Sequence, residues 1–226
     1  DSIADALAAR YPRGRFGRPF VVRNMPMRQP HPIAPDRSLW DRYGVPTERP
    51  IVLMQGAFID RDRGGKVAVS ALEHLSEVTL VFIGAGSEFD WAVEQQPKWN
   101  GRLHCIPKLP YTELVPLTAS ADVGLSLDQG VYGNFYLSLP NKLFDYIHAG
   151  LPVVATDLPE VSRIVNAHEV GQITPSSSPE AIADTIRSVL ATPRATWRTR
   201  CELAAQVLNW ESDSTHILSA IDRAMK

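Results

Sequence analysis

The sequence predicts an α/β protein, built on a Rossmann-like parallel sheet with helices on both faces. From residue 50 onward, short apolar runs alternate with segments of helical periodicity, which is typical of strands joined by crossover helices. The run at residues 152–156, PVVAT, is largely apolar and rich in β-branched residues, as expected of a strand covered on both faces. The 226 residues, 44% of them hydrophobic and 21% charged, suffice for one large globular domain.

Each element of this pattern has its own signal. Gly150 suits the left-handed residue that ends a helix, just before the buried run at 152–156. The connections between successive parallel strands are expected to be right-handed. The expected strands are residues 51–54, 78–83, 103–106, 123–127, 152–156 and 171–174. The helices expected between and after them are residues 65–75, 88–94, 111–121, 140–149, 159–167, 179–191, 193–208 and 211–225.

The first fifty residues read differently. Residues 2–10 predict a short helix and residues 20–22 a strand. Residues 25–35 hold four of the eighteen prolines, which excludes an ordinary helix or a central strand. We interpret this run as an interdomain linker, and the alternative is a proline-rich loop within one domain. The chain begins at Asp1 without a methionine, so we expect a fragment of a longer protein.

Composition excludes several classes of protein. A net charge of −2 does not favour a nucleic-acid partner, and no apolar run approaches the roughly 20 residues that span a bilayer. Two cysteines, Cys105 and Cys201, and six histidines without ligand spacing predict neither a disulfide framework nor a metal site. This cysteine usage fits a reducing cytoplasm.

Ligands of open parallel sheets bind beyond the carboxyl ends of the strands, so the loops at that edge are candidates. In residues 55–66, Gly56 permits close approach of backbone, and Arg63 and Lys66 flank a helix start, which favours an anion there. The alternative is a solvated basic loop. Residues 83–87 contain a G-x-G, but Phe89 stands where a dinucleotide fingerprint needs a small residue, so we expect only a tight turn.

Two further loops complete this edge. Residues 107–111 form a stiff, non-helical turn, and residues 128–138 are too long and aromatic for a plain connection. The second loop leads into the helix at 140–149, where Lys142 lies in the first turn and Asp145 one turn later. A cation beside free helix N–H groups suggests a bound anion. For Asp145 alone, an exposed helix carboxylate is the alternative.

Residues 138–157, SLPNKLFDYIHAGLPVVATD, carry a family resemblance. An acidic residue five positions before Gly150, then Gly-x-Pro-Val-Val-Ala, and the preceding PNKLFDY run resemble the family 4 retaining glycosyltransferases of the GT-B fold (glycosyltransferase group 1). The resemblance covers residues 51–210 and is to the carboxy-terminal, donor-binding half. It implies transfer of a sugar from a nucleotide-sugar to an acceptor with retention of configuration, in bacterial glycan or polysaccharide synthesis.

The resemblance also implies a domain division and partners. Residues 1–35 would be the tail of the amino-terminal acceptor domain and the linker, residues 36–210 the nucleotide-sugar-binding domain, and residues 211–226 a helix that crosses back near the linker. A glycan or lipid-linked acceptor would bind through the missing domain. No cofactor or metal is expected, because protein groups would bind the diphosphate of the donor. The full protein would be cytoplasmic, with peripheral association at the inner face of the membrane.

Site residues carry over position by position. Arg63 and Lys66, with close approach of backbone at Gly56, and the N–H groups of Asn141, Lys142 and Leu143 would hold the diphosphate. Backbone around Lys108 and Leu109 would contact the base, and Asp145 the ribose hydroxyls. Catalytic residues are not assigned.

The chain departs from the family pattern at two positions. Ala57 replaces an arginine, and Leu137 replaces a glutamate that usually contacts the donor sugar. The alternatives are a GT-B sugar-nucleotide epimerase, or a non-catalytic sugar-nucleotide-binding module, which Leu137 favours. His148 is expected to be packed rather than catalytic, and Asp122 to orient backbone.

Overall fold

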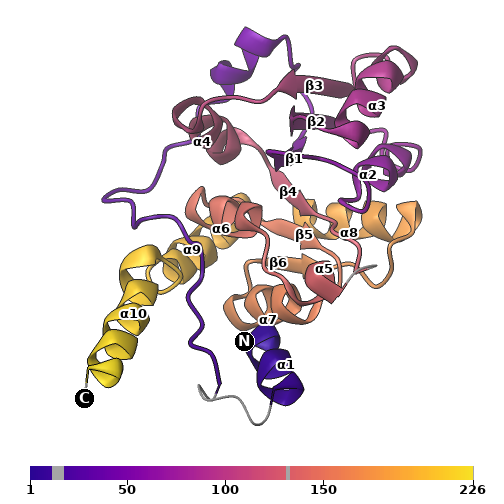
Figure 1. Cartoon of the computed structure of the whole chain (residues 1–226). Helices are drawn as coiled ribbons and strands as arrows, with labels where there is room; N and C mark the ends of the chain where they lie inside the picture. The colour runs from indigo at the N-terminus through magenta and orange to yellow at the C-terminus, as the bar shows by residue number, and fades with distance from the viewer. Residues whose placement is uncertain (12–17, 131–132, 226) are drawn as a thin grey trace.

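The fold is a single parallel sheet between two layers of helices (Figure 1). A computed structural model describes residues 1–11, 18–130 and 133–225. Six strands pair in the order β3-β2-β1-β4-β5-β6, all parallel. This order is that of the doubly wound Rossmann fold, which confirms the predicted fold class. The strands are β1 (Ile51–Gly56), β2 (Thr79–Gly84), β3 (Leu103–Pro107), β4 (Val123–Ser126), β5 (Val153–Ala155) and β6 (Gly171–Ile173).

Helices cover both faces of the sheet because successive strand residues point to opposite sides. In β1, Ile51 and Leu53 join one buried cluster, whereas Val52 and Met54 join the other. The cluster containing Val52 includes residues of α2 (Gly65–Ala71), α3 (Ser87–Gln95) and α8 (Pro179–Ala191). The cluster containing Ile51 includes residues of η1 (Arg37–Tyr43), α4 (Tyr111–Ser120), α6 (Asn141–His148), α7 (Pro159–His168) and α9 (Arg194–Ala205). The remaining helices are α1 (Ser2–Arg10), η2 (Gln96–Trp99), α5 (Gly133–Leu137) and α10 (Trp210–Ala224).

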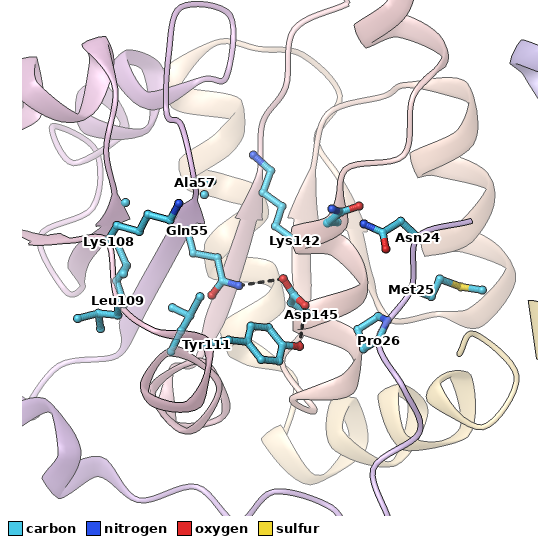
Figure 2. A pocket seen from close by; sticks show the side chains of 15 residues that line it. Asn24, Met25, Pro26, Gln55, Ala57, Lys108, Leu109, Tyr111, Lys142 and Asp145 are labelled. Atoms are coloured by element: carbon cyan, nitrogen blue, oxygen red, sulfur yellow. Dashed lines mark hydrogen bonds between the residues drawn. The ribbon is translucent and has the colours of Figure 1, made fainter. Parts of the chain in front are cut away.

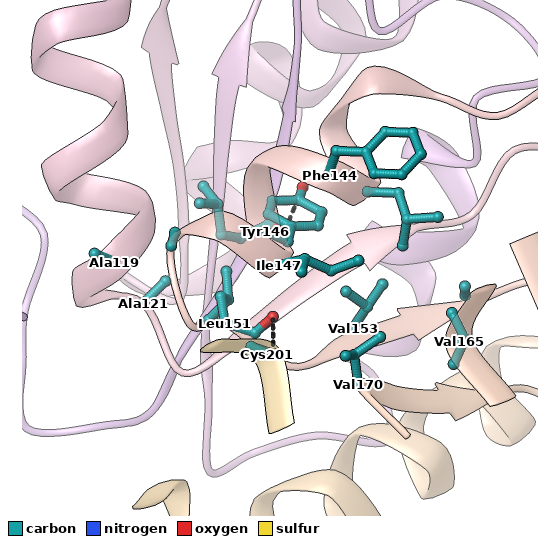
Figure 3. Packing of buried hydrophobic residues seen from close by; sticks show 14 of the residues in the cluster. Ala119, Ala121, Phe144, Tyr146, Ile147, Leu151, Val153, Val165, Val170 and Cys201 are labelled. Carbon is teal, nitrogen blue, oxygen red and sulfur yellow. Dashed lines mark hydrogen bonds between the residues drawn. The ribbon is translucent and has the colours of Figure 1, made fainter. Parts of the chain in front are cut away.

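Helix α6 is fixed to the sheet by Tyr146, which is fully buried (Figure 3). Its hydroxyl accepts the Gln55 N–H at 3.1 Å and lies 3.3 Å from the Leu53 carbonyl oxygen of β1 and 3.2 Å from the Leu125 carbonyl oxygen of β4. A Cβ at Gly124 would lie 2.7 Å from the Tyr146 ring, so glycine is required for this close approach. The helix therefore packs at the boundary between β1 and β4. This boundary is the switch point of the sheet, where the strand order changes direction.

Three local predictions differ from the structure. Residues 20–22 form no strand. They do not pair with β3 or β6, the described strands at the two edges of the sheet. Helix α2 ends at Ala71 instead of residue 75, as the chain continues in turns with bonds to the third preceding residue. The expected loop at 128–138 contains the short helix α5, and its residues 131–132 lie outside the described part of the chain.

The last helix lies beside the proline-rich segment, as predicted. The Trp210 N–H donates to the Pro26 carbonyl at 2.9 Å, and the Arg28 N–H donates to the Glu211 carboxylate at 2.9 Å. Figure 1 shows this segment running past the junction of α9 and α10. Farther along α10, Leu218 is 63% exposed and Ile221 48%. Within the described ranges, no helix is both long enough and apolar enough to cross a membrane.

Candidate functional site

A cavity of about 500 Å³ opens at the carboxyl ends of β1, β2 and β3, against the first turns of α6 (Figure 2). This is the edge at which open parallel sheets bind ligands. Five segments of the chain line it: the start of the proline-rich segment, the ends of β1 and β2, the β3–α4 region and α6. Its residues are Asn24, Met25, Pro26, Gln55, Gly56, Ala57, Ile83, Gly84, Lys108, Leu109, Tyr111, Leu114, Asn141, Lys142 and Asp145.

Asp145 is the carboxylate of this cavity. It accepts hydrogen bonds from the Tyr111 hydroxyl at 3.1 Å and from the Gln55 amide nitrogen at 3.5 Å, drawn as dashed lines in Figure 2. The Thr118 hydroxyl donates to the Gln55 amide oxygen at 2.7 Å, which turns the amide nitrogen toward Asp145. Burial raises the pKa of Asp145, although the Tyr111 and Gln55 hydrogen bonds and the nearby His148 oppose the shift.

No lysine or arginine of the described residues forms an ion pair with Asp145. An ionised carboxylate has more acceptor sites than the two donors occupy. Asp145 can therefore accept further hydrogen bonds from a ligand that carries hydroxyl groups.

The cations of the site are organised around Asp128, which follows β4. Its Oδ1 lies 2.7 Å from the Arg63 guanidinium and its Oδ2 lies 3.0 Å from the Lys142 ammonium. Burial would raise the pKa of Asp128, but the charges and hydrogen bonds of Lys142 and Arg63 outweigh it and lower the pKa. Lys142 leaves α6 in a different direction from Asp145 (Figure 2), so one helix presents a cation and a carboxylate separately.

The start of α6 offers backbone donors. Its N-cap is Pro140, which has no side-chain hydrogen bond to the helix. The Leu143 N–H already donates to the Pro140 carbonyl at 3.1 Å, whereas among the described contacts the N–H groups of Asn141 and Lys142 have no protein acceptor. These two N–H groups, together with the Lys142 ammonium, favour an anion at this end of the helix.

The structure brings six of the nine predicted residues together. Gly56, Lys108, Leu109, Asn141, Lys142 and Asp145 line the cavity.

The other three predicted residues lie outside the lining. The Arg63 guanidinium lies 4.4 Å from the centre of the Phe135 ring and reaches the site through Asp128. The Lys66 ammonium lies 5.5 Å from the centre of the Trp91 ring. The Leu143 side chain is buried in the core, so only its backbone is near the helix start.

Sequence reasoning missed several residues of the site. Gln55 had a signal, because it is the one polar side chain at the end of the apolar strand β1. Tyr111 and Asp128 had weaker signals, as polar residues that follow β3 and β4. Asn24 and Met25 had none, because their place in the cavity depends on how the proline-rich segment folds back over α6.

The expected packing of His148 and the expected backbone contact of Asp122 are confirmed. A ring nitrogen of His148 lies 2.7 Å from the Leu208 carbonyl oxygen, which ties α6 to the end of α9. Asp122 accepts the Ile51 N–H at 2.7 Å and pairs with Arg37 at 2.7 Å and Arg194 at 3.1 Å. Asp122 therefore orients the first residue of β1 and lies away from the cavity.

Fold and site together define a Rossmann-like domain with a crevice suited to an anionic, hydroxyl-bearing ligand at its switch point. Residues 49–192 match the family described as glycosyl transferases group 1. The match covers more than half of the chain, which therefore belongs to this family. A search of curated proteins finds no match.

Solved structures share the fold at low sequence identity. The chain is similar to WaaG, a glycosyltransferase involved in lipopolysaccharide biosynthesis, with a TM-score of 0.64 and 19% identity over 87% of this chain and 54% of WaaG. It is similar to the sucrose-phosphate synthase of Thermosynechococcus elongatus, with a TM-score of 0.73 and 19% identity over 99% of this chain and 57% of that protein. The chain is also similar to Anabaena HepE, solved in complex with UDP, with a TM-score of 0.68 and 16% identity over 82% of this chain and 52% of HepE.

These likenesses show that the chain has the fold of one half of a GT-B glycosyltransferase. The chain spans about half the length of each of these three proteins.

Proposed function

We propose that this chain is the donor-binding half of a family 4 retaining glycosyltransferase and that it binds a nucleotide-sugar in the crevice beside α6. One observation carries the proposal: Lys142 and Asp145 leave the same helix within one turn, and both line a single cavity at the switch point. A nucleotide-sugar carries an anionic diphosphate and ribose hydroxyls, which a cation and a carboxylate bind respectively. Membership of the glycosyl transferases group 1 family supports this assignment, as does the UDP complex of the structurally similar HepE.

In this proposal each part of the donor has its own place in the cavity. The diphosphate would lie at the start of α6, against the Lys142 ammonium and the N–H groups of Asn141 and Lys142. The ribose hydroxyls would donate to Asp145, in competition with Tyr111. The base would lie against the backbone of Lys108 and Leu109, which line the cavity beyond β3.

The same groups would assist the reaction. When the bond between sugar and phosphate breaks, negative charge increases on the departing diphosphate, and preorganised donors stabilise it. Lys142 and the α6 N–H groups supply that stabilisation in our proposal, with Arg63 behind them and with no metal ion or cofactor required. The acceptor, a glycan or lipid-linked glycan of bacterial polysaccharide synthesis, would bind through a second domain at the cytoplasmic face of the membrane.

Calorimetric titration of the chain with UDP, GDP and ADP tests the donor site. Lys142→Ala should weaken binding of the preferred nucleotide by about 1.5–3 kcal/mol, the range for hydrogen bonds to charged groups. Lys98→Ala is the matched control, because Lys98 is an exposed lysine that binds only the Gln95 side chain among the described residues. Equal affinity in wild type and Lys142→Ala would show that the diphosphate lies elsewhere.

A second titration tests the ribose contact. Wild type should bind a 2′,3′-dideoxy nucleoside diphosphate more weakly than the ribonucleotide, and Asp145→Asn should reduce that difference. The same discrimination in both proteins would exclude a ribose role for Asp145.

Turnover by the full-length protein tests the reaction. Proton NMR of the product should show a glycoside whose anomeric configuration matches the donor, formed equally well with EDTA present. A free epimerised sugar would instead assign an epimerase, and binding without turnover a non-catalytic module.

A further inference from the structure

Asp128 is a buried carboxylate that lies behind the proposed donor site. It is 3% exposed, yet it does not line the cavity. A charge so far removed from water persists only when it is paired and hydrogen-bonded. Its partners therefore indicate what it does in this fold.

The partners come from two segments far apart in the sequence. Arg63 precedes α2 and Lys142 lies in the first turn of α6, and each binds a different oxygen of Asp128, at 2.7 Å and 3.0 Å. Without a carboxylate between them, two cations this close would repel each other. Asp128 therefore both brings Arg63 and Lys142 together and fixes the position of each.

Asp128 is itself held on a rigid base. The Thr156 hydroxyl donates to the Asp128 carbonyl at 2.6 Å, from the end of β5. The next N–H, that of Gln129, donates to the Asp62 carbonyl at 2.8 Å, one residue before Arg63. The carboxylate is thus anchored to the sheet on one side and to the Arg63 loop on the other.

The ammonium of Lys142 is the group that this arrangement places. A lysine side chain loses rotamer entropy when it is fully ordered, and ordering it at the moment of binding weakens the complex. The Lys142 side chain is only 11% exposed and already bound to Asp128, although it lies on the cavity wall. The ordering is therefore complete before any anion arrives.

We propose that Asp128 is a positioning residue, which holds Lys142, with Arg63 beside it, in the orientation that receives the diphosphate of the donor. The inference rests on the proposed function and adds a residue to it. Charge alone predicts the opposite effect, because a carboxylate near the site repels the diphosphate. The two effects have opposite signs on affinity, so a substitution distinguishes them.

The experiment is a double-mutant cycle of UDP affinity by calorimetry, with GDP and ADP as further probes. Asp128→Asn keeps the shape of the side chain and removes its charge. It should bind UDP about threefold to tenfold more weakly than wild type, which corresponds to ordering one long side chain on binding. In the Lys142→Ala background the same substitution should change affinity less than twofold. A role in stability alone would produce no such coupling.

Asp128→Glu is a second variant, for use also where Asp128→Asn does not fold as judged by circular dichroism. It keeps the charge but moves the carboxylate by one methylene, so positioning predicts weaker binding and a counterion effect predicts none. Tighter binding by Asp128→Asn, unchanged binding by Asp128→Glu, or equal losses with and without Lys142 would overturn the inference. Failure of wild type to bind any of the three nucleotides, or no effect of Lys142→Ala alone, would instead contradict the proposed function.

Discussion

Replacing Tyr146 by phenylalanine removes a single oxygen atom from the junction of β1, β4 and α6. That oxygen accepts the Gln55 N–H at 3.1 Å, and it lies 3.2 Å from the Leu125 carbonyl oxygen. Both Tyr146 and Gln55 are buried, so water cannot take the place of the hydroxyl without a rearrangement. The ring itself stays, so the packing shown in Figure 3 is preserved and no large cavity forms.

The magnitude follows from the group that is left unpaired. A buried N–H without an acceptor costs about 1–3 kcal/mol, and the carbonyls add less, since a carbonyl tolerates a missing donor better than an N–H tolerates a missing acceptor. We expect Tyr146→Phe to lower the free energy of unfolding by about 2 kcal/mol. For a chain of this length that corresponds to roughly 4–8 °C in the midpoint of thermal unfolding.

Urea unfolding followed by circular dichroism measures this change. Tyr43→Phe is the matched control, because it also removes one hydroxyl, but from an exposed hydrogen bond to Glu113 at 3.1 Å. Its effect should stay within about 0.5 kcal/mol. If Tyr146→Phe proves as stable as Tyr43→Phe, the Tyr146 hydroxyl does not hold α6 to the sheet.

Three further predictions concern the surroundings of the site. Gly64→Ala should destabilise the chain by more than about 2 kcal/mol, because φ is +81° and the new Cβ would lie 2.4 Å from a backbone carbonyl oxygen; Gly44→Ala, at φ +64° with no atom within 4 Å, should cost about 1 kcal/mol, measured by urea unfolding. Asp122→Ala should lower the free energy of unfolding by about 2–4 kcal/mol, because the Ile51 N–H loses its acceptor and two arginines lose their partner. Asp184→Ala is the control at an exposed residue and should lower it by under about 0.5 kcal/mol. Because the pKa of Asp128 is lowered, its ionised form stabilises the folded chain at pH values above the unfolded pKa, which is near 3.9, and this stabilisation is lost as the pH falls through the folded pKa. The difference in unfolding free energy between wild type and Asp128→Asn should therefore shrink in acid. A constant difference between pH 7 and pH 3 would contradict this.

The alternation of apolar runs with helical periodicity was sufficient to predict the strands of the sheet. A buried parallel strand is a short apolar run, which can be recognised without knowledge of distant contacts. The run at 152–156 became β5 and Gly150 took φ +70° at the end of α6, both for reasons contained in a few residues. Residues 20–22 have the same composition as a strand but form none. A strand needs a neighbour, and a short apolar run does not reveal whether a sheet edge is near.

Site residues could be predicted where the local sequence marks them, but not where their role depends on a contact with a distant residue. Lys142 and Asp145 stand out because a charge interrupts an amphipathic helix. Asp128 follows β4 without any local sign that Arg63, 65 residues earlier, will reach it. Asn24 lies in the cavity next to the proline-rich segment, which hydrogen bonds with Trp210 and Glu211 hold against the start of α10.

Asp128 and Asp145 show why the two carboxylates near α6 have different consequences for the fold. Asp128 is paired with two cations and its pKa is lowered, so ionisation stabilises the folded chain. Among the described residues, Asp145 accepts hydrogen bonds only from Tyr111 and Gln55, and burial raises its pKa. Its contribution to stability is present below the unfolded pKa and is lost as the pH rises through the folded pKa.

Ionisation of Asp145 therefore lowers the stability of the folded chain relative to the protonated form. Two neutral donors hold it in place without neutralising it, and a bound ligand with hydroxyl groups can replace either donor. A carboxylate paired as Asp128 is would be more stable but would have its acceptor sites occupied by cations. The Asp145 oxygens thus remain able to accept hydrogen bonds from a ligand, and the chain is less stable as a result, as is typical of binding sites. The fold can retain this residue because Tyr146, the next residue along α6, fixes the helix to β1 and β4.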